Sequence, residues 1–207
     1  MSGHQTGQND HHTGPHAHTD TDADADADAR ETTPADRDAD AAGRDRDPAG
    51  RPRNARPRDA LGRPLPKGAP GVERVPDDYA PDAGRAVADA LAYLVEERPF
   101  HAHEVLEARW KTGPQDEREL WQGLAQICVG LTHLQRGNTR GAATLLDRGA
   151  DRLARYDAGT AATHRRPVDL TAAVRAAREL TEHPATPAAE AIAQVADAFR
   201  ASPAGRS

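Results

Sequence analysis

Apolar residues in the second half of the chain recur at helical spacing, and the runs are separated by prolines, glycines and capping residues. From residue 82 onward an apolar side chain returns every three or four positions, which places these side chains on one face of an α-helix. No run alternates convincingly between apolar and polar residues, as a half-buried strand requires. The pattern predicts helices over residues 82–97, 99–111, 117–136, 139–156, 170–182 and 187–199.

The residues between these runs predict how the helices begin and end. We expect Gly113 to close the second helix in a left-handed conformation, and Asp116 to begin a capping box for the third. Gly137 is expected to close the third helix, and Asn138 or Thr139 to cap the fourth. So short a connection makes the third and fourth helices an antiparallel hairpin.

The N-terminal part of the chain has a different composition. Residues 2–60 contain no Val, Ile, Leu, Met, Phe, Trp, Tyr or Cys. Such a segment cannot bury enough apolar surface to offset about 1–2 kcal/mol of backbone entropy per residue. We therefore predict a disordered Asp/Ala- and Arg-rich tail over 1–60, a Pro/Gly-rich extended arm over 61–80, and an α-helical domain over 81–200. Four apolar residues are expected to anchor the arm on the domain: Leu61, Leu65, Val72 and Val75. The predicted fold class is all-α, a compact bundle of about five to six helices behind a long tail.

Charge and cysteine content narrow the class of protein. The chain has 207 residues, a net charge of −6 and one cysteine, which excludes an intramolecular disulfide and a cysteine-based metal cluster. No apolar stretch approaches the roughly 18 residues that span a bilayer, and no secretory signal is visible. We expect a cytoplasmic protein without a membrane partner. The Arg-rich part of the tail lacks aromatic residues for base stacking, which argues against nucleic acid as a partner.

A polar line follows the predicted core side of the second helix. Phe100, His103, Glu107 and Trp110 are separated by steps of three, four and three residues, so they share one side of it. With both aromatic rings pointing inward, His103 and Glu107 are expected to turn inward too, with Glu104 at the shoulder of that face. Buried polar groups of this kind need partners, because leaving them unpaired is costly.

The third helix has a leucine stripe on its predicted core face: Leu120, Leu124, Ile127, Leu131 and Leu134. A comparable polar line, which contains Gln122, Gln126 and His133, adjoins this stripe. We therefore predict a polar seam between the second and third helices. Its candidate residues are His103, Glu104, Glu107, Trp110, Gln122, Gln126, His133 and Asn138.

Several other residues are expected to have structural roles only. Gly123 and Gly130 stand two turns apart and allow a neighbouring backbone to approach the third helix closely. Cys128 is expected to be a small core residue. His101 and His183 are expected to face solvent.

Three interpretations of the polar seam stay open. Its groups can satisfy one another and set the helix register. They can orient a small molecule in a pocket walled by Trp110 and Trp121. They can also hold a metal ion, with His103, Glu107 and His133 as candidate ligands; the local string "HEVLE" is not the H-E-x-x-H of zinc proteases.

Two segments resemble a known family. "RPFHAHEVLEARW" and "ELWQGLAQICVGLTHLQRGNTRGAATLLDRGADRL" are similar to domain-of-unknown-function family 309, over about residues 90–155. The resemblance implies a compact α-helical bundle and implies no established activity. The positions that carry it are Phe100, His103, Glu104, Glu107, Trp110, Gly123, Gln126, His133, Gly137, Asn138, Gly141 and Ala142.

The sequence favours a binding module for a small ligand or a partner. The alternative is a metal-dependent hydrolase-like enzyme that would use the same cluster, with Glu104 as general base. The cofactor and the partner are not specified by the sequence, and a homo-oligomer stays open.

Overall fold

A computed structural model describes residues 56–76, 78–159 and 167–200, all within one compact unit spanning residues 54–207. The predicted tail lies outside the described residues up to residue 55. Apart from one isolated bridge, the described part of the chain contains no β-structure, so the all-α prediction is confirmed. None of its helices has the length and apolar character needed to cross a bilayer. The α-helices are α2 (Ala83–Val95), α3 (Pro99–Thr112), α4 (Arg118–Gln135), α5 (Thr139–Gly159), α6 (Leu170–Glu182) and α7 (Ala188–Arg200), with a short 3₁₀ turn, η1 (Gln115–Glu117), before α4.

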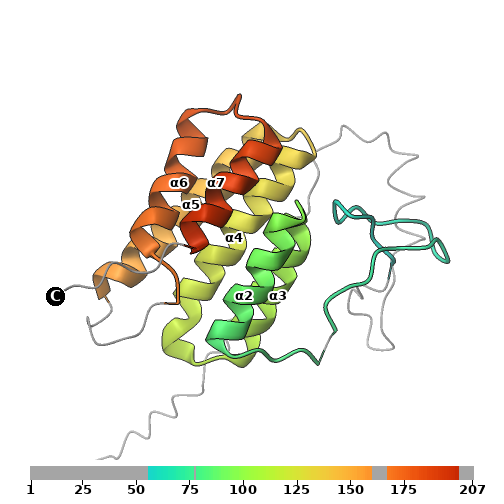
Figure 1. The fold of residues 1–207 in the computed structure, drawn as a ribbon, viewed down its shortest axis with the longest axis horizontal. Helices are drawn as coiled ribbons and strands as arrows, with labels where there is room; N and C mark the ends of the chain where they lie inside the picture. Colours follow the sequence, from blue (N-terminus) through green and yellow to red (C-terminus); the bar gives the residue numbers. More distant parts are fainter. Residues whose placement is uncertain (1–55, 77, 160–166, 201–207) are drawn as a thin grey trace, which may run out of the picture. The chain divides into compact units, whose positions relative to one another are not determined.

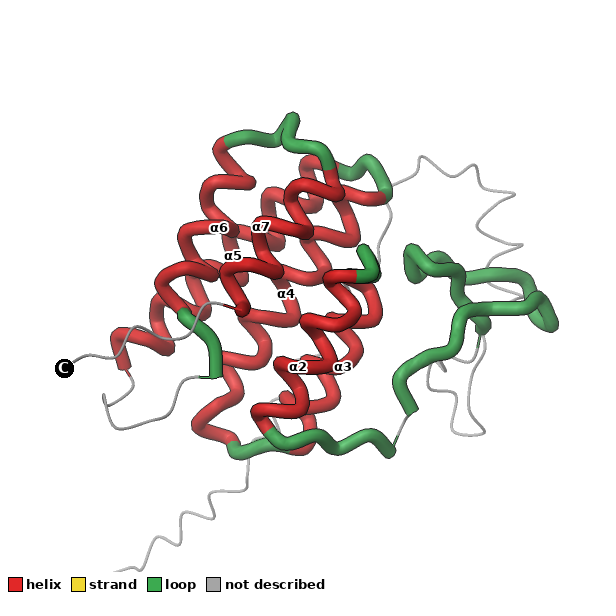
Figure 2. Tube along the Cα trace, viewed as in Figure 1, coloured by secondary structure: helices red, strands yellow, loops and turns green. Residues whose placement is uncertain are grey.

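The helices pack in chain order and close on themselves (Figures 1 and 2). Each helix from α2 to α7 packs against the next one, and α7 returns to pack against α2 and α4. The predicted leucine stripe of α4 lies at the centre: Leu120, Leu124, Ile127 and Leu131 are fully buried, and its last member, Leu134, is partly buried against the core. Trp121 beside them is also completely buried. The bundle is therefore organised around α4.

The turn between α4 and α5 follows the sequence prediction. Gly137 has φ +77°, the left-handed conformation expected at the end of a helix. Asn138 accepts a hydrogen bond on Oδ1 from the backbone N–H of Gly141 at 2.9 Å. Asn138, rather than Thr139, therefore caps α5.

The turn between α3 and α4 differs from the prediction. Gly113 has φ −85° and ψ 178°, an extended conformation, because a residue that precedes proline is driven out of the helical regions. The capping box at Asp116 does not form either, since η1 precedes the helix and the N-cap Glu117 makes no side-chain cap bond. The Glu117 carboxylate instead accepts from Arg109 at 2.6 Å and from the Trp121 indole N–H at 2.8 Å. The Glu117 side chain thus bonds to Arg109 and Trp121 and does not cap α4.

Glycines bring α4 and α5 into close contact, as predicted for Gly123 and Gly130. A Cβ on Gly123 would lie 2.8 Å from the Leu153 side chain and 3.1 Å from the Gly149 carbonyl oxygen. A Cβ on Gly130 would lie 2.9 Å from Leu146. The neighbour that approaches is α5, whose own Gly149 contributes a third small residue to the interface.

The arm is folded back on itself before it reaches α2. Arg58 and Pro64 form an antiparallel bridge, and the N–H of Val72 donates to the Arg58 carbonyl at 2.8 Å. The described arm includes residues 56–60, which the composition assigned to the tail. Val75 packs against the core, and the other predicted anchors, Leu61, Leu65 and Val72, are half-buried. The arm and the bundle are joined in part by the Arg136 side chain, whose Nε donates to the Leu61 carbonyl at 3.0 Å.

Candidate functional site

The α3 helix is rotated relative to the predicted orientation. Its core side carries Ala102, Val105 and Leu106, all at most 1% exposed. His103 and Glu107 lie on the flank, with side chains 22% and 32% exposed, so the prediction that they turn into the core is corrected to a half-buried position. The small and branched apolar side chains take the core face because α4 packs closely against it.

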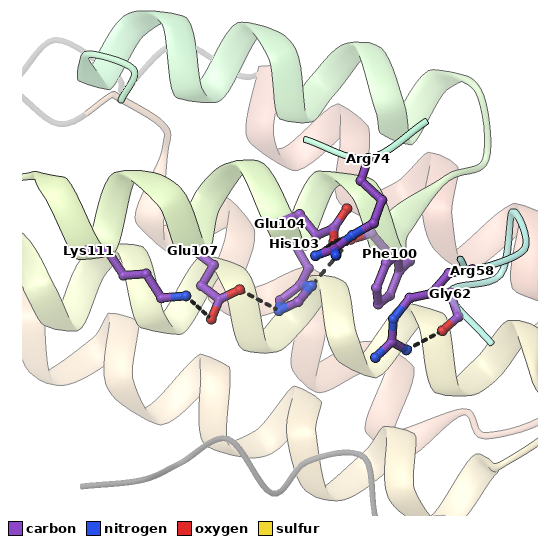
Figure 3. Close-up of polar contacts among 8 residues, drawn as sticks. All are labelled: Arg58, Gly62, Arg74, Phe100, His103, Glu104, Glu107 and Lys111. Atoms are coloured by element: carbon purple, nitrogen blue, oxygen red, sulfur yellow. Dashed lines mark hydrogen bonds and ion pairs between the residues drawn. The ribbon is translucent and has the colours of Figure 1, made fainter. Parts of the chain in front are cut away.

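The flank of α3 carries a chain of charged groups, drawn in Figure 3. His103 Nε2 lies 3.7 Å from Glu107 Oε2, and Lys111 Nζ lies 2.8 Å from Glu107 Oε1. Burial alone would raise the pKa of Glu107, but His103 and Lys111, with a further contribution from Arg74, hold it below its usual value. Glu107 is therefore a carboxylate with its own partners on the same helix.

Glu104 is more deeply buried and has a partner from the arm. Its side chain is 8% exposed, and its Oε1 accepts from Nε and Nη2 of Arg74 at 3.2 and 3.1 Å. Figure 3 shows Arg74 reaching from the arm onto this carboxylate. The second oxygen, Oε2, is buried and has no hydrogen-bond partner among the described residues. Glu104 thus has one oxygen paired with the arm and one buried oxygen without a hydrogen-bond partner among the described residues.

Phe100, one turn before Glu104, is also covered by the arm. The guanidinium of Arg58 lies 5.2 Å from the centre of the Phe100 ring, and its Nη1 donates to the Gly62 carbonyl at 2.5 Å. Gly62 has φ +73°, and a Cβ there would lie only 2.2 Å from the ring. The arm therefore contacts Phe100 in two ways: through the Arg58 guanidinium, and through the backbone of Gly62, which lies directly against the ring because glycine has no side chain.

The prediction for His101 is wrong, because its side chain is 1% exposed. Its ring packs against Tyr93 and Phe100, with centroids 5.4 and 5.6 Å away. Burial, followed by the positive charge of Arg98, lowers the pKa of His101 to about 4, while a hydrogen bond to the backbone of Glu73 opposes the shift. The helical pattern missed this residue because the arm covers a side of α3 that the pattern assigns to solvent. His183 is exposed, as predicted.

The predicted α4 residues find their contacts on α5 and at the α4–α5 turn. Gln122 Oε1 accepts from Arg152 on α5 at 2.7 Å. His133 Nδ1 is 2.9 Å from Asn138 Nδ2. Because the Asn138 oxygen already accepts from a backbone N–H, its amide nitrogen donates to His133 Nδ1, which assigns the ring proton to Nε2. Gln126 is partly buried, and its Oε1 has no hydrogen-bond partner among the described residues.

The eight predicted residues therefore occupy several places. Glu104 meets the arm, as does Phe100 of the same polar line, and the His103–Glu107 pair lies beside them. Trp110 is half-buried under the guanidinium of Arg118 from α4, 5.3 Å from the ring centre. Gln122 contacts α5, and His133 contacts Asn138 at the α4–α5 turn. Sequence reasoning also missed the arm's contribution, Arg58 and Arg74, because the arm residues carry no helical period.

The metal interpretation lacks a ligand set. In the described part of the chain, no group of three His, Cys, Asp or Glu side chains is placed to hold a metal ion. His103 and Glu107 are thus not joined there by His133, which contacts Asn138 instead. Cys128 is completely buried, as predicted for a core residue, and burial raises the pKa of its thiol.

Comparison with known proteins confirms the resemblance. The family described as domain of unknown function (DUF309) matches residues 87–145, from within α2 to within α5. The uncharacterized protein YpuF of Bacillus subtilis (strain 168) is 42% identical over 64 residues, which cover 27% of this chain and 35% of that protein. The chain thus covers about a third of the length of this curated relative. No solved structure matches. Residues 87–145 are thus similar to the DUF309 family and are called the DUF309 segment below; Phe100 and Glu104 lie inside it, and the arm lies outside it.

Proposed function

We propose that the chain acts as a helical binding module for a polypeptide partner. Its binding surface is the arm-facing side of α3, with Phe100 and Glu104 at the centre and His103 and Glu107 on the flank. The ligand class is an extended segment that carries arginine. The observation that carries this proposal is the part-buried contact between Glu104 of the DUF309 segment and Arg74 of an arm that lies outside that segment.

The roles of the other motif residues support this choice. Asn138 and His133 build the α4–α5 turn, and Gly123 allows the two helices to approach, so the fold itself accounts for them. Glu104 is different, because a buried carboxylate without a cation is costly, and its cation comes from outside the matched segment. A carboxylate placed in this way is suited to recognising a guanidinium.

The contact pattern favours a polypeptide over a small molecule. The arm meets α3 at two separated points, where Arg58 lies over the Phe100 ring and Arg74 pairs with Glu104. The backbone of Gly62 also lies against the Phe100 ring. By contrast, Gln122 and His133 of the predicted seam already have partners in the bundle. The surface on α3 is therefore the part of the predicted site that accepts an outside chain.

A peptide titration tests the proposal. The full-length chain carrying Arg58→Ala and Arg74→Ala, whose own arm is weakened, is titrated into a fluorescein-labelled peptide of residues 56–76 and followed by anisotropy. We expect saturable binding, and at least about tenfold weaker binding when Glu104→Gln is added, equivalent to about 1.4 kcal/mol.

The matched control is Glu107→Gln, which removes a neighbouring carboxylate that pairs with Lys111 on its own helix. This variant should bind the peptide within about threefold of its parent, a difference of less than 1 kcal/mol. Circular dichroism verifies that each variant is folded. Absence of saturable binding, or equal losses from Glu104→Gln and Glu107→Gln, would refute the proposal.

A further inference from the structure

We propose that the arm is a displaceable internal ligand, and that the partner which replaces it is an arginine-bearing extended segment whose guanidinium engages both carboxylate oxygens of Glu104. This inference rests on the proposed function and adds two things to it. It states how the arginine of the partner engages Glu104, through both carboxylate oxygens, and it states that the arm of the 207-residue chain occupies the binding surface and competes with the partner.

The geometry of the Arg74–Glu104 contact supports displacement. Nε and Nη2 of Arg74 both donate to Oε1, at 3.2 and 3.1 Å. Oε2 stays buried without a hydrogen-bond partner in the described structure. An arginine and a carboxylate pair best as two parallel bonds, one to each oxygen. The arm therefore leaves part of the recognition capacity of Glu104 unused, and a segment that approaches from a better angle gains the second bond.

The chemistry of the surface favours arginine over lysine. A guanidinium can span two carboxylate oxygens and can also stack on an aromatic ring, whereas an ammonium acts as a compact point charge. Both features occur here in the arm itself, with Arg58 over the Phe100 ring at 5.2 Å and Arg74 on Glu104. A lysine at either position would lose the planar contact.

The way the arm is held is consistent with release. Within residues 56–76 no helix forms, and the only β-pairing is the single bridge between Arg58 and Pro64. The arm meets α3 through the Arg58 and Arg74 side chains and through its backbone at Gly62 and Glu73, and the Arg74 side chain itself is 32% exposed. Segments with few buried contacts open at low free energy. A tethered ligand nevertheless has a high effective concentration, so it weakens the apparent affinity for any free competitor.

Two glycines in the arm provide a matched pair of variants. Gly62 and Gly68 both have a positive φ, +73° and +84°, so alanine strains the backbone at both positions. Only at Gly62 would the added Cβ strike a neighbour, the Phe100 ring at 2.2 Å, while nothing lies within 4 Å at Gly68. Gly62→Ala should therefore lift the arm from α3, and Gly68→Ala should leave it in place. Neither substitution touches Glu104.

The experiment measures binding of labelled 56–76 peptides to three full-length proteins: the wild type, Gly62→Ala and Gly68→Ala. We expect Gly62→Ala to bind the peptide at least tenfold more tightly than the wild type, and Gly68→Ala to match the wild type within about twofold. A second peptide with Arg74→Lys should bind Gly62→Ala at least fivefold more weakly than the unaltered peptide. Static light scattering on the same samples reports the oligomeric state.

The outcomes separate this inference from the function on which it rests. If the peptide binds all three proteins equally, the arm is not a competitor and the inference is overturned, although the binding surface stands. Equal affinity for the Arg and Lys peptides overturns the assigned partner chemistry. A wild-type dimer that Gly62→Ala dissociates means that the arm is exchanged between two copies, which also overturns an internal ligand. Binding to none of the proteins, including the Arg58→Ala/Arg74→Ala variant, refutes the proposed function itself.

Discussion

Arg74 and Glu104 lie 30 residues apart in the sequence and form an ion pair, with Nη2 and Oε1 separated by 3.1 Å. The contact ties the arm to the DUF309 segment at a carboxylate whose side chain is 8% exposed, whereas Glu107, one turn further along, is 32% exposed. This order of burial is the reverse of the sequence prediction, which turned Glu107 inward and placed Glu104 at the shoulder of the core face.

The two carboxylates should differ in their contribution to stability. Glu104→Ala removes a buried carboxylate that pairs with the partly exposed Arg74, and we expect the free energy of unfolding to fall by about 1–2 kcal/mol. Glu107→Ala disrupts a half-exposed pair with Lys111, so its cost should be about 0.5 kcal/mol. Urea denaturation of both variants measures the difference. Equal losses would show that the depth of Glu104 has no energetic consequence.

The glycine contact between α4 and α5 should be sensitive to a single methyl group. Gly123→Ala gains helix propensity but places a Cβ 2.8 Å from Leu153, and we expect a net destabilisation of about 1–3 kcal/mol. Gly84→Ala is the control, because its Cβ would approach only the Asp82 carboxylate, at 3.4 Å. This variant should be neutral or slightly stabilised. Thermal unfolding distinguishes the two, and a Gly123→Ala protein as stable as the wild type would mean that the helices can move apart freely.

The cap of α5 offers a test at two adjacent residues. Asn138→Ala loses the hydrogen bond to the Gly141 N–H and the contact with His133, and should cost about 1 kcal/mol. Thr139 is exposed and is the first residue of α5, so Thr139→Ala should change the free energy of unfolding by less than about 0.5 kcal/mol. If chemical denaturation shows a larger loss of stability for Thr139→Ala than for Asn138→Ala, Asn138 is not the residue that caps α5.

Acidification should destabilise the protein through His101. Burial, with the neighbouring charge of Arg98, lowers the pKa of His101 to about 4, while an unfolded histidine has a pKa near 6.5. The stabilising contribution of the neutral ring is thus complete above about pH 6.5 and is lost as the pH falls toward 4, because the unfolded chain binds a proton that the folded one resists. Between pH 7 and pH 5 this linkage amounts to about 2 kcal/mol.

The control for His101 is a variant that cannot titrate. His101→Phe should lose less stability than the wild type between pH 7 and pH 5, because the remaining pH dependence comes from other groups. His183→Ala removes an exposed histidine and should keep the wild-type pH profile. Urea midpoints measured at both pH values provide the comparison. Identical profiles for His101→Phe and the wild type would show that the ring is already hydrated in the folded protein.

Much of the fold could be predicted because the residues that form, begin and end a helix lie within it or next to it in the sequence. All six α-helices of the described residues were predicted, with ends within three residues of those observed, since helical period, proline, glycine and the Asn138 cap act over short distances. Cap predictions succeeded where the turn is self-contained, as at Gly137. They failed at Asp116, where η1 precedes α4 and the side chain of the N-cap Glu117 is engaged by Arg109 of α3 and by Trp121 one turn along α4.

The candidate site was predictable only in part. The sequence by itself determined a helical bundle, a polar line on α3 and the segment that matches DUF309. Only the tertiary structure decided that Glu104 and His101, rather than Glu107, are the deeply buried polar groups of α3, that Arg74 pairs with Glu104, and that Arg58 lies over the Phe100 ring. The physical reason is that an extended arm has no period of its own. Its side chains acquire positions only when it lies on a surface built by residues far along the chain.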